Sequence, residues 1–315
     1  MSPRALGLLA GYLADRLVGD PATGHPVAVF GGLAGRAEQR WWADDRRAGA
    51  TYAAALVGGV TAAGLATERT THRHPWLRFL ATAATTWAVL GGRSLLQEAH
   101  AVTTQLATDD LEAARRQLTH LVGRDTDTLD EPGIARATIE SLAENTSDAV
   151  VAPLLAGAVA GIPGLMAYRA ANTLDAMVGH RSARHANFGW ASARLDDAFN
   201  WVPARVTALL AVLLAPAVGG RSSVARQIWH RDAHGHPSPN AGPVEAAFAG
   251  ALGVQLGGIN MYGGRVEDRS TLGDGPAPTR SDIAVAAHLA TLVSHGAAAA
   301  AFTVALTRQR RRRRR

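Results

Sequence analysis

Five long apolar runs constrain what this chain can fold into. They cover residues 51–66, 76–92, 150–168, 202–220 and 283–306. A helix that crosses a membrane needs about 20 mostly apolar residues, and each run comes close to that length. Ala-rich runs also form buried helices of soluble all-α proteins, which is the alternative. Five such runs in one chain favour an integral membrane protein.

We therefore expect an all-α, polytopic membrane protein with about five apolar helices and with polar helical loops that carry the functional site. The uncharged run 150–168 is interrupted by Pro and Gly, and acidic motifs lie both before and after it. A bent or re-entrant path suits this run, because irregular backbone is tolerated in a membrane only where protein or a cavity covers it. No segment alternates as a strand does.

The sequence predicts a single membrane-embedded catalytic domain over residues 1–307, followed by a disordered Arg-rich tail over residues 308–315. The net charge of +6 is misleading, because the tail alone contains seven arginines. The positive-inside rule places this C-terminus in the cytoplasm. Aromatic and basic residues are not interleaved in any patch, so we expect no nucleic-acid partner.

Two residue types are missing, and their absence excludes several kinds of chemistry. The chain has no Cys, which excludes disulfides, thiolate metal sites and Cys nucleophiles. All 32 of its basic residues are Arg, so it has neither the lysine of a phosphate-binding loop nor a lysine for a Schiff base.

The segment ESLAENTSD, residues 140–148, places three acids just before an apolar run. Glu140, Glu144 and Asp148 are spaced i, i+4 and i+8, so on an α-helix they form one stripe. Like charges at this spacing repel, and a cation over the stripe would reverse that cost. Mg²⁺ suits such a pattern, because it binds through one or two carboxylates, waters and phosphate oxygens. The alternative is a solvated acidic face.

A second polar cluster lies between two of the apolar runs. Its acids and amides are Asn172, Asp175, Asp196, Asp197 and Asn200, and its arginines include Arg169, Arg181 and Arg205. Carboxylates can hold a metal while guanidinium groups bind phosphate oxygens bidentately, so the mixture is typical of a phosphate–Mg²⁺ site. The alternative is a set of interfacial salt bridges with snorkelling arginines, but such a lattice has no use for the amides.

A third polar stretch covers residues 230–264. His230, His234 and His236 suggest zinc, but their spacing does not match a helical HExxH motif, and loop histidines are the simpler interpretation. SPNAGP, residues 238–243, reads as a turn before a helix whose free N–H groups could bind an anion. The paired glycines at 257–258 and 263–264 allow close backbone approach, without any dinucleotide fingerprint.

Five motifs resemble one known family, and they occur in that family's order. They are GDPATGHPV (19–27), ESLAENTSDAVVAPL (140–154), GIPGLMAYRAANTLDAMVGHR (161–181), FGWASARLDDAFNWVPAR (188–205) and SPNAGPVEAAFAGALGVQLGG (238–258). In these blocks the chain resembles the adenosylcobinamide-phosphate synthases, the CobD/CbiB family of cobalamin biosynthesis. It departs from the family pattern at Ala149, where Gly is usual, and at Arg169, where Lys is usual. Arg stays charged, so Arg169 is a poor proton-shuttling base.

The resemblance implies a multi-pass enzyme of the cell membrane, a carbon–nitrogen ligase. Its substrates would be the corrinoid adenosylcobyric acid and (R)-1-aminopropan-2-ol phosphate or aminopropanol, joined by an amide bond with ATP and Mg²⁺. Its partners would be these substrates, membrane lipid and other late enzymes of the cobalamin pathway. The reaction requires a leaving group on the corrinoid carboxyl, for which we expect an acyl phosphate made from ATP.

We assign roles to the polar residues on this basis. The candidate catalytic acids are Glu140, Glu144, Asp148, Asp175, Asp196 and Asp197, and all of them except Glu140 are also candidate metal ligands. The candidate substrate- and phosphate-binding residues are Asn145, Arg169, Asn172, Arg181, Asn200, Arg205 and Asn240. Two other classes stay open: a membrane prenyl- or phosphotransferase that uses Mg²⁺ and diphosphate, and a non-catalytic transporter or scaffold.

Overall fold

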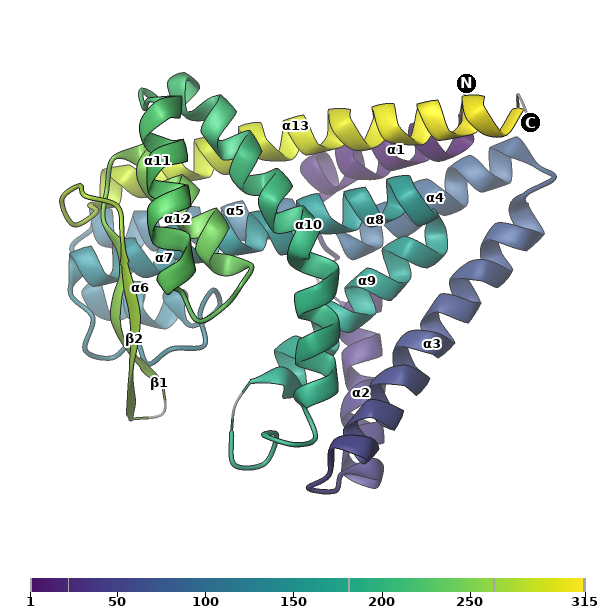
Figure 1. Ribbon diagram of the computed structural model, residues 1–315, viewed down its shortest axis with the longest axis horizontal. Coiled ribbons are helices and arrows are strands. Elements are labelled where there is room, and N and C mark those ends of the chain that lie inside the picture. Colours follow the sequence, from purple (N-terminus) through teal and green to yellow (C-terminus); the bar gives the residue numbers. More distant parts are fainter. Residues whose placement is uncertain (1, 22, 181, 263, 314–315) are drawn as a thin grey trace. The chain divides into compact units, whose positions relative to one another are not determined.

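The computed structural model describes residues 2–21, 23–180, 182–262 and 264–313 (Figure 1). The chain forms two compact units, and each is discontinuous in sequence. The N-terminal unit consists of Met1–Gly91, Ala152–Asn200 and Ala297–Arg315; the central unit consists of Gly92–Val151 and Trp201–Gly296. Because the chain passes between the units several times, no linker composition marks a boundary, and the sequence predicted one domain.

Helices make up the N-terminal unit. They are α1 (Pro3–Val18), α2 (Pro26–Trp41), α3 (Arg46–Thr71), α4 (Pro75–Val89), α8 (Ala152–Ala160), α9 (Ile162–Leu174), the π-helical turn η2 (Asp175–Gly179), the start of α10 (Trp190–Leu214) and the end of α13 (Arg280–Arg313). α1 packs closely on α4, because Gly7 and Gly11 have no side chains and face Thr82 and Thr86. A core of apolar residues from α2, α3 and α9 includes Tyr52, and Phe188 from the segment before α10 packs in the same core.

The central unit adds a small hairpin to its helices. Its elements are α5 (Gly92–Ala107), α6 (Leu111–Leu118), α7 (Glu131–Thr146), the π-helical turn η1 (Ser147–Val151), the 3-10 turns η3 (Ala215–Val218) and η4 (Ala233–Gly235), α11 (Ser222–Asp232), α12 (Ala241–Leu252), β1 (Leu256–Tyr262) and β2 (Arg265–Leu272), with the rest of α10 and α13. Asp130 begins α7, because its carboxylate accepts the N–H of Gly133 at 2.9 Å. The core includes Ile134, Ile139 and Leu142 of this helix.

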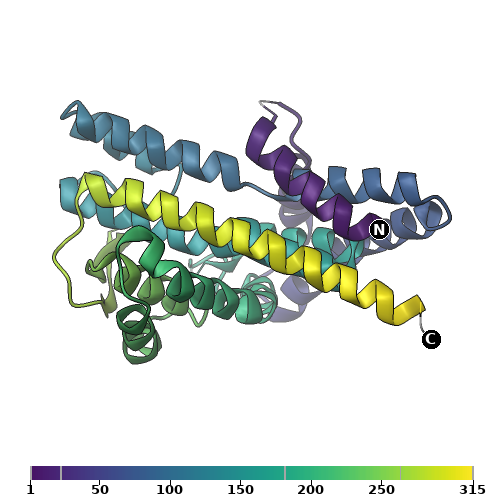
Figure 2. The same ribbon diagram turned by 90° about the horizontal axis from the view of Figure 1, so that it is seen from above.

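Among the described residues, three helical stretches are long and apolar enough to cross a membrane. They are Arg46–Thr71, Trp190–Val218 and Arg280–Gln309. α13 is the longest, and Figures 1 and 2 show it as one unbroken yellow helix. These stretches contain three of the five apolar runs of the sequence, so the predicted count of about five spans is not confirmed.

The two other apolar runs do not form a single helix of membrane-crossing length, and the reason differs between them. The run 76–92 extends beyond α4, which ends at Val89 and whose 15 residues are about 22 Å long, less than the hydrocarbon thickness of a bilayer. The run 150–168 is broken at Gly161, whose φ of 76° ends α8 before Pro163 helps to begin α9. This run is therefore not one continuous helix, and a re-entrant path for it stays a prediction.

Two further features differ from the sequence-based expectations. α13 continues to Arg313, past the point at which the tail was expected to become disordered, because arginine is a good helix former. β1 and β2 form an antiparallel hairpin that we did not predict. Tyr262 pairs with Arg265 across two glycines, and a Gly–Gly pair between two short β-like runs is a hairpin signal.

Candidate functional site

A cluster of amides and one carboxylate connects α9 to α10 in the N-terminal unit. Asn172 and Asn200 each donate a hydrogen bond from Nδ2 to the carboxylate of Asp196, at 3.3 and 2.9 Å. The hydroxyl of Tyr168 donates to Oδ1 of Asn200 at 2.8 Å. We call these four residues the amide–carboxylate cluster. Three of the four, Tyr168, Asp196 and Asn200, are buried, so the acid in α10 is fixed in one orientation by its amide partners.

The other described residues that we predicted for this part of the chain have longer hydrogen bonds to the cluster or contacts outside it. Arg169 donates to Oδ1 of Asn172 at 3.4 Å, so one predicted phosphate-binding residue contacts a predicted substrate-binding residue. Asp197 pairs with Arg194 at 3.5 Å and is partly exposed. Asp175 begins the π-helical turn η2, close to Gly179. Arg181 lies outside the described residues.

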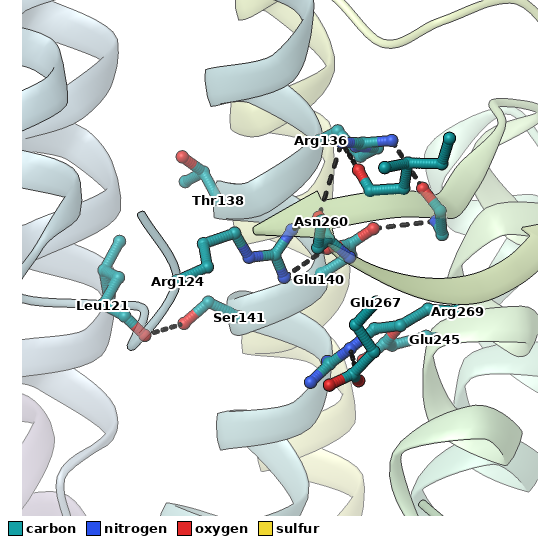
Figure 3. A network of polar contacts seen from close by, with 12 residues as sticks. Leu121, Arg124, Arg136, Thr138, Glu140, Ser141, Glu245, Asn260, Glu267 and Arg269 are labelled. Atoms are coloured by element: carbon teal, nitrogen blue, oxygen red, sulfur yellow. Dashed lines mark hydrogen bonds and ion pairs between the residues drawn. The ribbon is translucent and has the colours of Figure 1, made fainter. Parts of the chain in front are cut away.

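A buried ion pair organises the central unit (Figure 3). Glu140 of α7 has Oε2 at 2.6 Å from Nη2 of Arg124, and the two side chains are 2% and 5% exposed. Its other oxygen, Oε1, accepts the backbone N–H of Gly257 in β1 at 2.7 Å. The cation over this predicted catalytic acid is therefore an arginine of the same chain.

The hairpin is tied to the same ion pair by two arginines. Arg124 donates from Nη1 to Oδ1 of Asn260 at 2.7 Å, and Figure 3 shows these side chains pointing toward one another. Arg136, one turn before Glu140 on α7, donates to the carbonyl oxygens of Gly257 at 2.6 Å and Ile259 at 3.2 Å. The paired glycines noted in the sequence thus serve to present backbone groups to Glu140 and Arg136.

Positive φ angles explain why the hairpin needs glycine here. Gly257 and Gly258 have φ of 75° and 83°. A Cβ on Gly257 would lie 2.0 Å from the carbonyl oxygen of Ser270. The strand register shifts at this point, so that β2 holds one more residue than β1, and Arg269 lies in the resulting bulge.

Two more glutamates belong to the central unit's polar cluster. Glu245 of α12 is 1% exposed, while Glu144 of α7 is partly buried. Burial raises the pKa of the Glu245 carboxyl well above its usual range, and the charges of Glu140 and Glu144 raise it further. Burial also raises the pKa of Glu144, against the opposing effect of Arg269 and Arg124. We call Glu140, Glu144 and Glu245 the glutamate group.

Two arginines balance part of this negative charge. Burial alone would lower the pKa of Arg124, but Glu140 and Tyr262 together outweigh burial and the pKa is raised. The same holds for Arg269, whose pKa is raised by Tyr262 and by its hydrogen bond to Glu267. Both guanidinium groups therefore stay charged beside the glutamate group.

The predicted stripe of three acids does not extend to Asp148. The α-helix ends at Thr146 and continues as the π-helical turn η1, so the i, i+4, i+8 alignment assumed for α7 ends one residue before Ser147. Asp148 is partly buried in η1. Asn145, predicted to bind substrate, donates to the carbonyl oxygen and to Oγ of Ser141, both at 3.0 Å.

The SPNAGP turn precedes α12, as predicted, and its polar groups are already engaged. Ser238 accepts the backbone N–H of Ala241 at 3.1 Å through Oγ. Oδ1 of Asn240 accepts a hydrogen bond from Nη1 of Arg205 at 3.0 Å. The same guanidinium lies over the ring of Trp201, 4.6 Å from its centroid. Arg205 and Asn240, both predicted from the sequence, thus meet in the structure.

His236 lies in the loop after η4, as expected for a loop histidine, and one of its ring nitrogens is hydrogen-bonded. It is buried, and its Nδ1 accepts the N–H of Ser238 at 3.1 Å. The neutral ring therefore carries its proton on Nε2, which lies 3.7 Å from Oε2 of Glu245. Burial lowers the pKa of His236, which favours this neutral form. His234 and His230 are exposed.

Sequence reasoning missed several residues of the central cluster. They are Arg124, Arg136, His236, Glu245, Asn260 and Arg269. One signal was available for Glu245, because it is an acid in the otherwise uncharged stretch after SPNAGP. Arg124 and Asn260 carry no local signal, since their partners lie far away along the chain.

The carboxylate and amide oxygens of the site fit a metal ion that is bound through few protein ligands. Among the residues that the structure describes, no three His, Asp or Glu side chains are placed so that they could hold a metal ion. Asp196 and its amide neighbours do offer hard oxygen donors, and Mg²⁺ is commonly bound by one or two carboxylates with phosphate and water completing its shell. The fit is to a metal that arrives with a phosphate, rather than to a metal held by a protein cage.

Fold and site together define a helical protein with helices of membrane-crossing length and with buried clusters of carboxylates, amides and guanidinium groups. A family model described as CobD/Cbib protein matches residues 8–290. The chain belongs to this CobD/CbiB family.

Similar proteins extend over nearly the whole chain. One named cobalamin biosynthesis protein CobD, from Mycobacterium tuberculosis, is 51% identical over 97% of this chain and 97% of its own length. Proteins of the same name from Chromobacterium violaceum and Rhodobacter capsulatus are 45% and 43% identical, and cover 90% and 83% of this chain and 91% and 83% of their own lengths. No solved structure matches the chain.

Proposed function

We propose that this chain is a carbon–nitrogen ligase of cobalamin biosynthesis. It joins adenosylcobyric acid to (R)-1-aminopropan-2-ol phosphate, or to aminopropanol, and gives adenosylcobinamide phosphate or adenosylcobinamide. Membership of the CobD/CbiB family and relatives named for cobalamin biosynthesis support the pathway. The structural observation behind an enzymatic role is Asp196, a buried acid held by two amides in a helix apolar enough to cross a membrane. Ionisable residues in such helices are typically functional.

The proposed reaction has two steps whose atoms balance. A corrinoid carboxylate oxygen takes the terminal phosphoryl group of ATP, and ADP leaves. The amine nitrogen then attacks the acyl carbon, so that a C–N bond forms and the C–O bond to phosphate breaks. The substrate ammonium loses two protons in all: one goes to a carboxylate of the protein, and the other leaves with the phosphate.

The arginines and amides supply the binding groups for phosphate. Arg169 lies next to the amide–carboxylate cluster, and a guanidinium group binds phosphate oxygens in a bidentate manner. Asn240 and Trp201 hold Arg205 in place through Nη1 and the face of its guanidinium group, so its other nitrogens could bind a ligand. Arg181 completes the proposed set. Asn145, Asn172 and Asn200 would orient the amide side chains of the corrinoid.

Asp175, Asp196 and Asp197 are the residues that we propose to hold Mg²⁺. When bound, Mg²⁺ neutralises charge on the phosphate oxygens of ATP. We reassign Glu144 from the proposed metal ligands to the glutamate group, because the charges that shift its pKa are those of Arg269, Arg124 and Glu140. Asp148 stays a proposed catalytic acid.

The proposed location is the cell membrane, with several spans and the C-terminus in the cytoplasm. The three helical stretches of membrane-crossing length support membrane insertion. Six arginines at residues 310–315 follow the last of these stretches, and arginines next to a span favour the cytoplasmic side. Association with other late enzymes of the pathway is part of the same proposal.

The experiment that tests the reaction is mass analysis of the product. Purified protein receives adenosylcobyric acid, aminopropanol phosphate, ATP and Mg²⁺, and each is omitted in turn. We expect the amide product only when the nucleotide, the metal and both substrates are present. No product from the complete mixture contradicts the proposal, and turnover of an isoprenoid diphosphate by the same protein would support a prenyltransferase instead.

Substitutions in membranes then test the assigned acids. Asp148→Asn and Asp196→Asn should abolish conversion of adenosylcobyric acid while the protein is still inserted and expressed. Asp109→Asn is the matched control, because the Asp109 side chain is 91% exposed and we assign it no role in the reaction. Unchanged turnover in both Asp148→Asn and Asp196→Asn would remove these acids from the reaction.

A further inference from the structure

The glutamate group places three carboxyl groups beside the guanidinium groups of Arg124 and Arg269. Each of the two guanidinium groups beside it already has an ion-pair partner: Arg124 pairs with Glu140 at 2.6 Å, and Arg269 pairs with Glu267 at 2.9 Å. Within the part of the chain that the structure describes, Glu144 and Glu245 have no arginine of their own. Nε2 of His236 lies 3.7 Å from Oε2 of Glu245, and burial of this ring favours its neutral form.

Two buried donors beside this group lack hydrogen-bond partners among the described residues. One is Nε2 of His236, whose side chain is 1% exposed and which faces Glu245 across 3.7 Å. The other is Nδ2 of Asn260, a residue that is 3% exposed and whose Oδ1 is occupied by Arg124. Buried polar groups are almost always paired, so an unpaired donor aimed at an acid that has no arginine partner indicates a ligand.

We propose that Glu144 and Glu245 bind the primary ammonium group of a small amino alcohol, or of its phosphate, and that His236 donates from Nε2 to the oxygen next to that ammonium. The inference rests on the proposed function, because the amine of the ligase reaction has this chemistry. Without a cation beside it the Glu245 carboxyl keeps its proton, because burial raises its pKa. An ammonium that binds there stabilises the ionised carboxylate and displaces this proton to solvent. The imidazole N–H supplies a donor that an alcohol or phosphate oxygen accepts.

The surroundings of Glu245 favour a cation of this kind over a metal ion. α7 contributes Glu140 and Glu144, β2 contributes Arg269 and Glu267, β1 contributes Tyr262, and Arg124 precedes α7. The charged pair of α11, Arg231 and Asp232, is engaged instead with Asp274 and with the N–H of Gly273. Two permanently charged guanidinium groups at one site repel a divalent ion more strongly than a single ammonium.

Glu144 and Arg269 lie nearer the protein surface than Glu245 and His236 do. Glu144 is partly buried rather than fully enclosed, and the Arg269 side chain is 20% exposed. Glu245 and His236 lie deeper, with side chains 2% and 1% exposed. A ligand that enters past Glu144 would therefore reach Glu245 with its ammonium and lose water on the way, which strengthens the charge pairing.

Calorimetry with the full-length protein in detergent tests the inference without turnover. The probes are 1-aminopropan-2-ol, its phosphate, propane-1,2-diol, which lacks the amine, and propan-1-amine, which lacks the hydroxyl. We expect the two amino alcohols to bind, the diol not to bind, and propan-1-amine to bind more weakly. The tighter of the two amino alcohols identifies the natural form of the substrate. Binding of the diol as tight as that of 1-aminopropan-2-ol would overturn the inference.

Three substitutions separate the two interactions. Glu245→Gln and Glu144→Gln should each weaken binding of 1-aminopropan-2-ol by about tenfold or more, because a charge-assisted hydrogen bond is lost. His236→Ala should remove the preference for 1-aminopropan-2-ol over propan-1-amine and leave propan-1-amine binding unchanged. Glu112→Gln is the matched control, since the Glu112 side chain is 73% exposed. Equal affinity in the wild type and in both glutamate variants would overturn the inference. If Glu245→Gln does not fold, the comparison of the wild type with Glu144→Gln alone decides.

Kinetics distinguish failure of this inference from failure of the proposed function. In the ligase assay, Glu144→Gln should raise the KM for the amine about tenfold and leave the KM for adenosylcobyric acid unchanged. An equal change in both KM values would overturn the ammonium assignment while the ligase activity stands. If the wild type makes no amide product, the ligase proposal fails, and the calorimetry still decides whether an ammonium binds here.

Discussion

Arg124 and Glu140 form an ion pair of 2.6 Å that is almost completely removed from water and that joins the loop before α7 to the helix itself. The same two residues reach the hairpin through Asn260 and the N–H of Gly257. One buried pair therefore connects two consecutive segments, the loop and α7, to a hairpin that lies 117 residues beyond Glu140. Loss of either partner would destabilise the fold, because the remaining charge would be buried without an opposite charge to offset its lost hydration.

Arg124→Met should destabilise the protein by about 3–5 kcal/mol, because it leaves the Glu140 carboxylate buried without its cation. The measurement is thermal or denaturant unfolding in detergent. Arg116→Met is the control, since the Arg116 side chain is 69% exposed and its pair with Glu112 contributes at most about 1 kcal/mol. The double variant Arg124→Met/Glu140→Gln should recover part of the lost stability. Equal effects of Arg124→Met and Arg116→Met would contradict this account.

Gly257→Ala should disrupt the hairpin and the hydrogen bond from its N–H to Glu140. The new Cβ would lie 2.0 Å from a backbone oxygen, and the left-handed φ of 75° adds about 1–2 kcal/mol of strain. Gly264→Ala shares the strain, with φ of 77°, but its Cβ would meet no atom within 4 Å. We expect Gly257→Ala to lower the Tm clearly more than Gly264→Ala, and a reversed order in unfolding experiments would refute the close approach.

Stability should fall as the pH rises above the ordinary pKa of glutamic acid. Burial raises the pKa of Glu245 well above its ordinary value of 4.5, so the folded state holds a proton that the unfolded chain has lost. The contribution of Glu245 is therefore complete below pH 4.5 and disappears as the pH rises through its folded-state pKa. Glu245→Gln should flatten this decline. The check is Tm against pH for the wild type, Glu245→Gln and Glu112→Gln, and identical curves for all three would be evidence against a protonated Glu245.

Gly11→Ala should weaken the packing of α1 on α4 in the N-terminal unit. Its Cβ would lie 2.4 Å from Cβ of Thr86 and 2.5 Å from the carbonyl oxygen of Ala83, and overpacking of this kind costs about 1–3 kcal/mol. Gly58→Ala in α3 is the opposite case, because nothing lies within 4 Å of its Cβ. That change should stabilise the helix by up to about 1 kcal/mol. Unfolding of the two variants in the same detergent provides the comparison.

The sequence predicted the local features of this protein well, because they depend on residues close together in the chain. The helical class, three helices of membrane-crossing length, the turn before α12 and the break within 150–168 follow from apolar runs, Gly and Pro. The count of about five spans is not confirmed, because an apolar run does not reveal how many of its residues continue as one helix. The hairpin was missed, although its Gly–Gly turn signal was present.

The candidate site divides in the same way. By itself the sequence determined which residues have the right chemistry: Glu140, Glu144, Asp196, Asn200 and Arg205 all lie in polar clusters of the structure. Only the tertiary structure decided their partners. Glu140 pairs with Arg124 and with a backbone N–H 117 residues away, and Glu245 joins it from α12. Spacing along a helix specifies a face, but the charge that meets that face comes from chain folding over long separations, which no local pattern encodes.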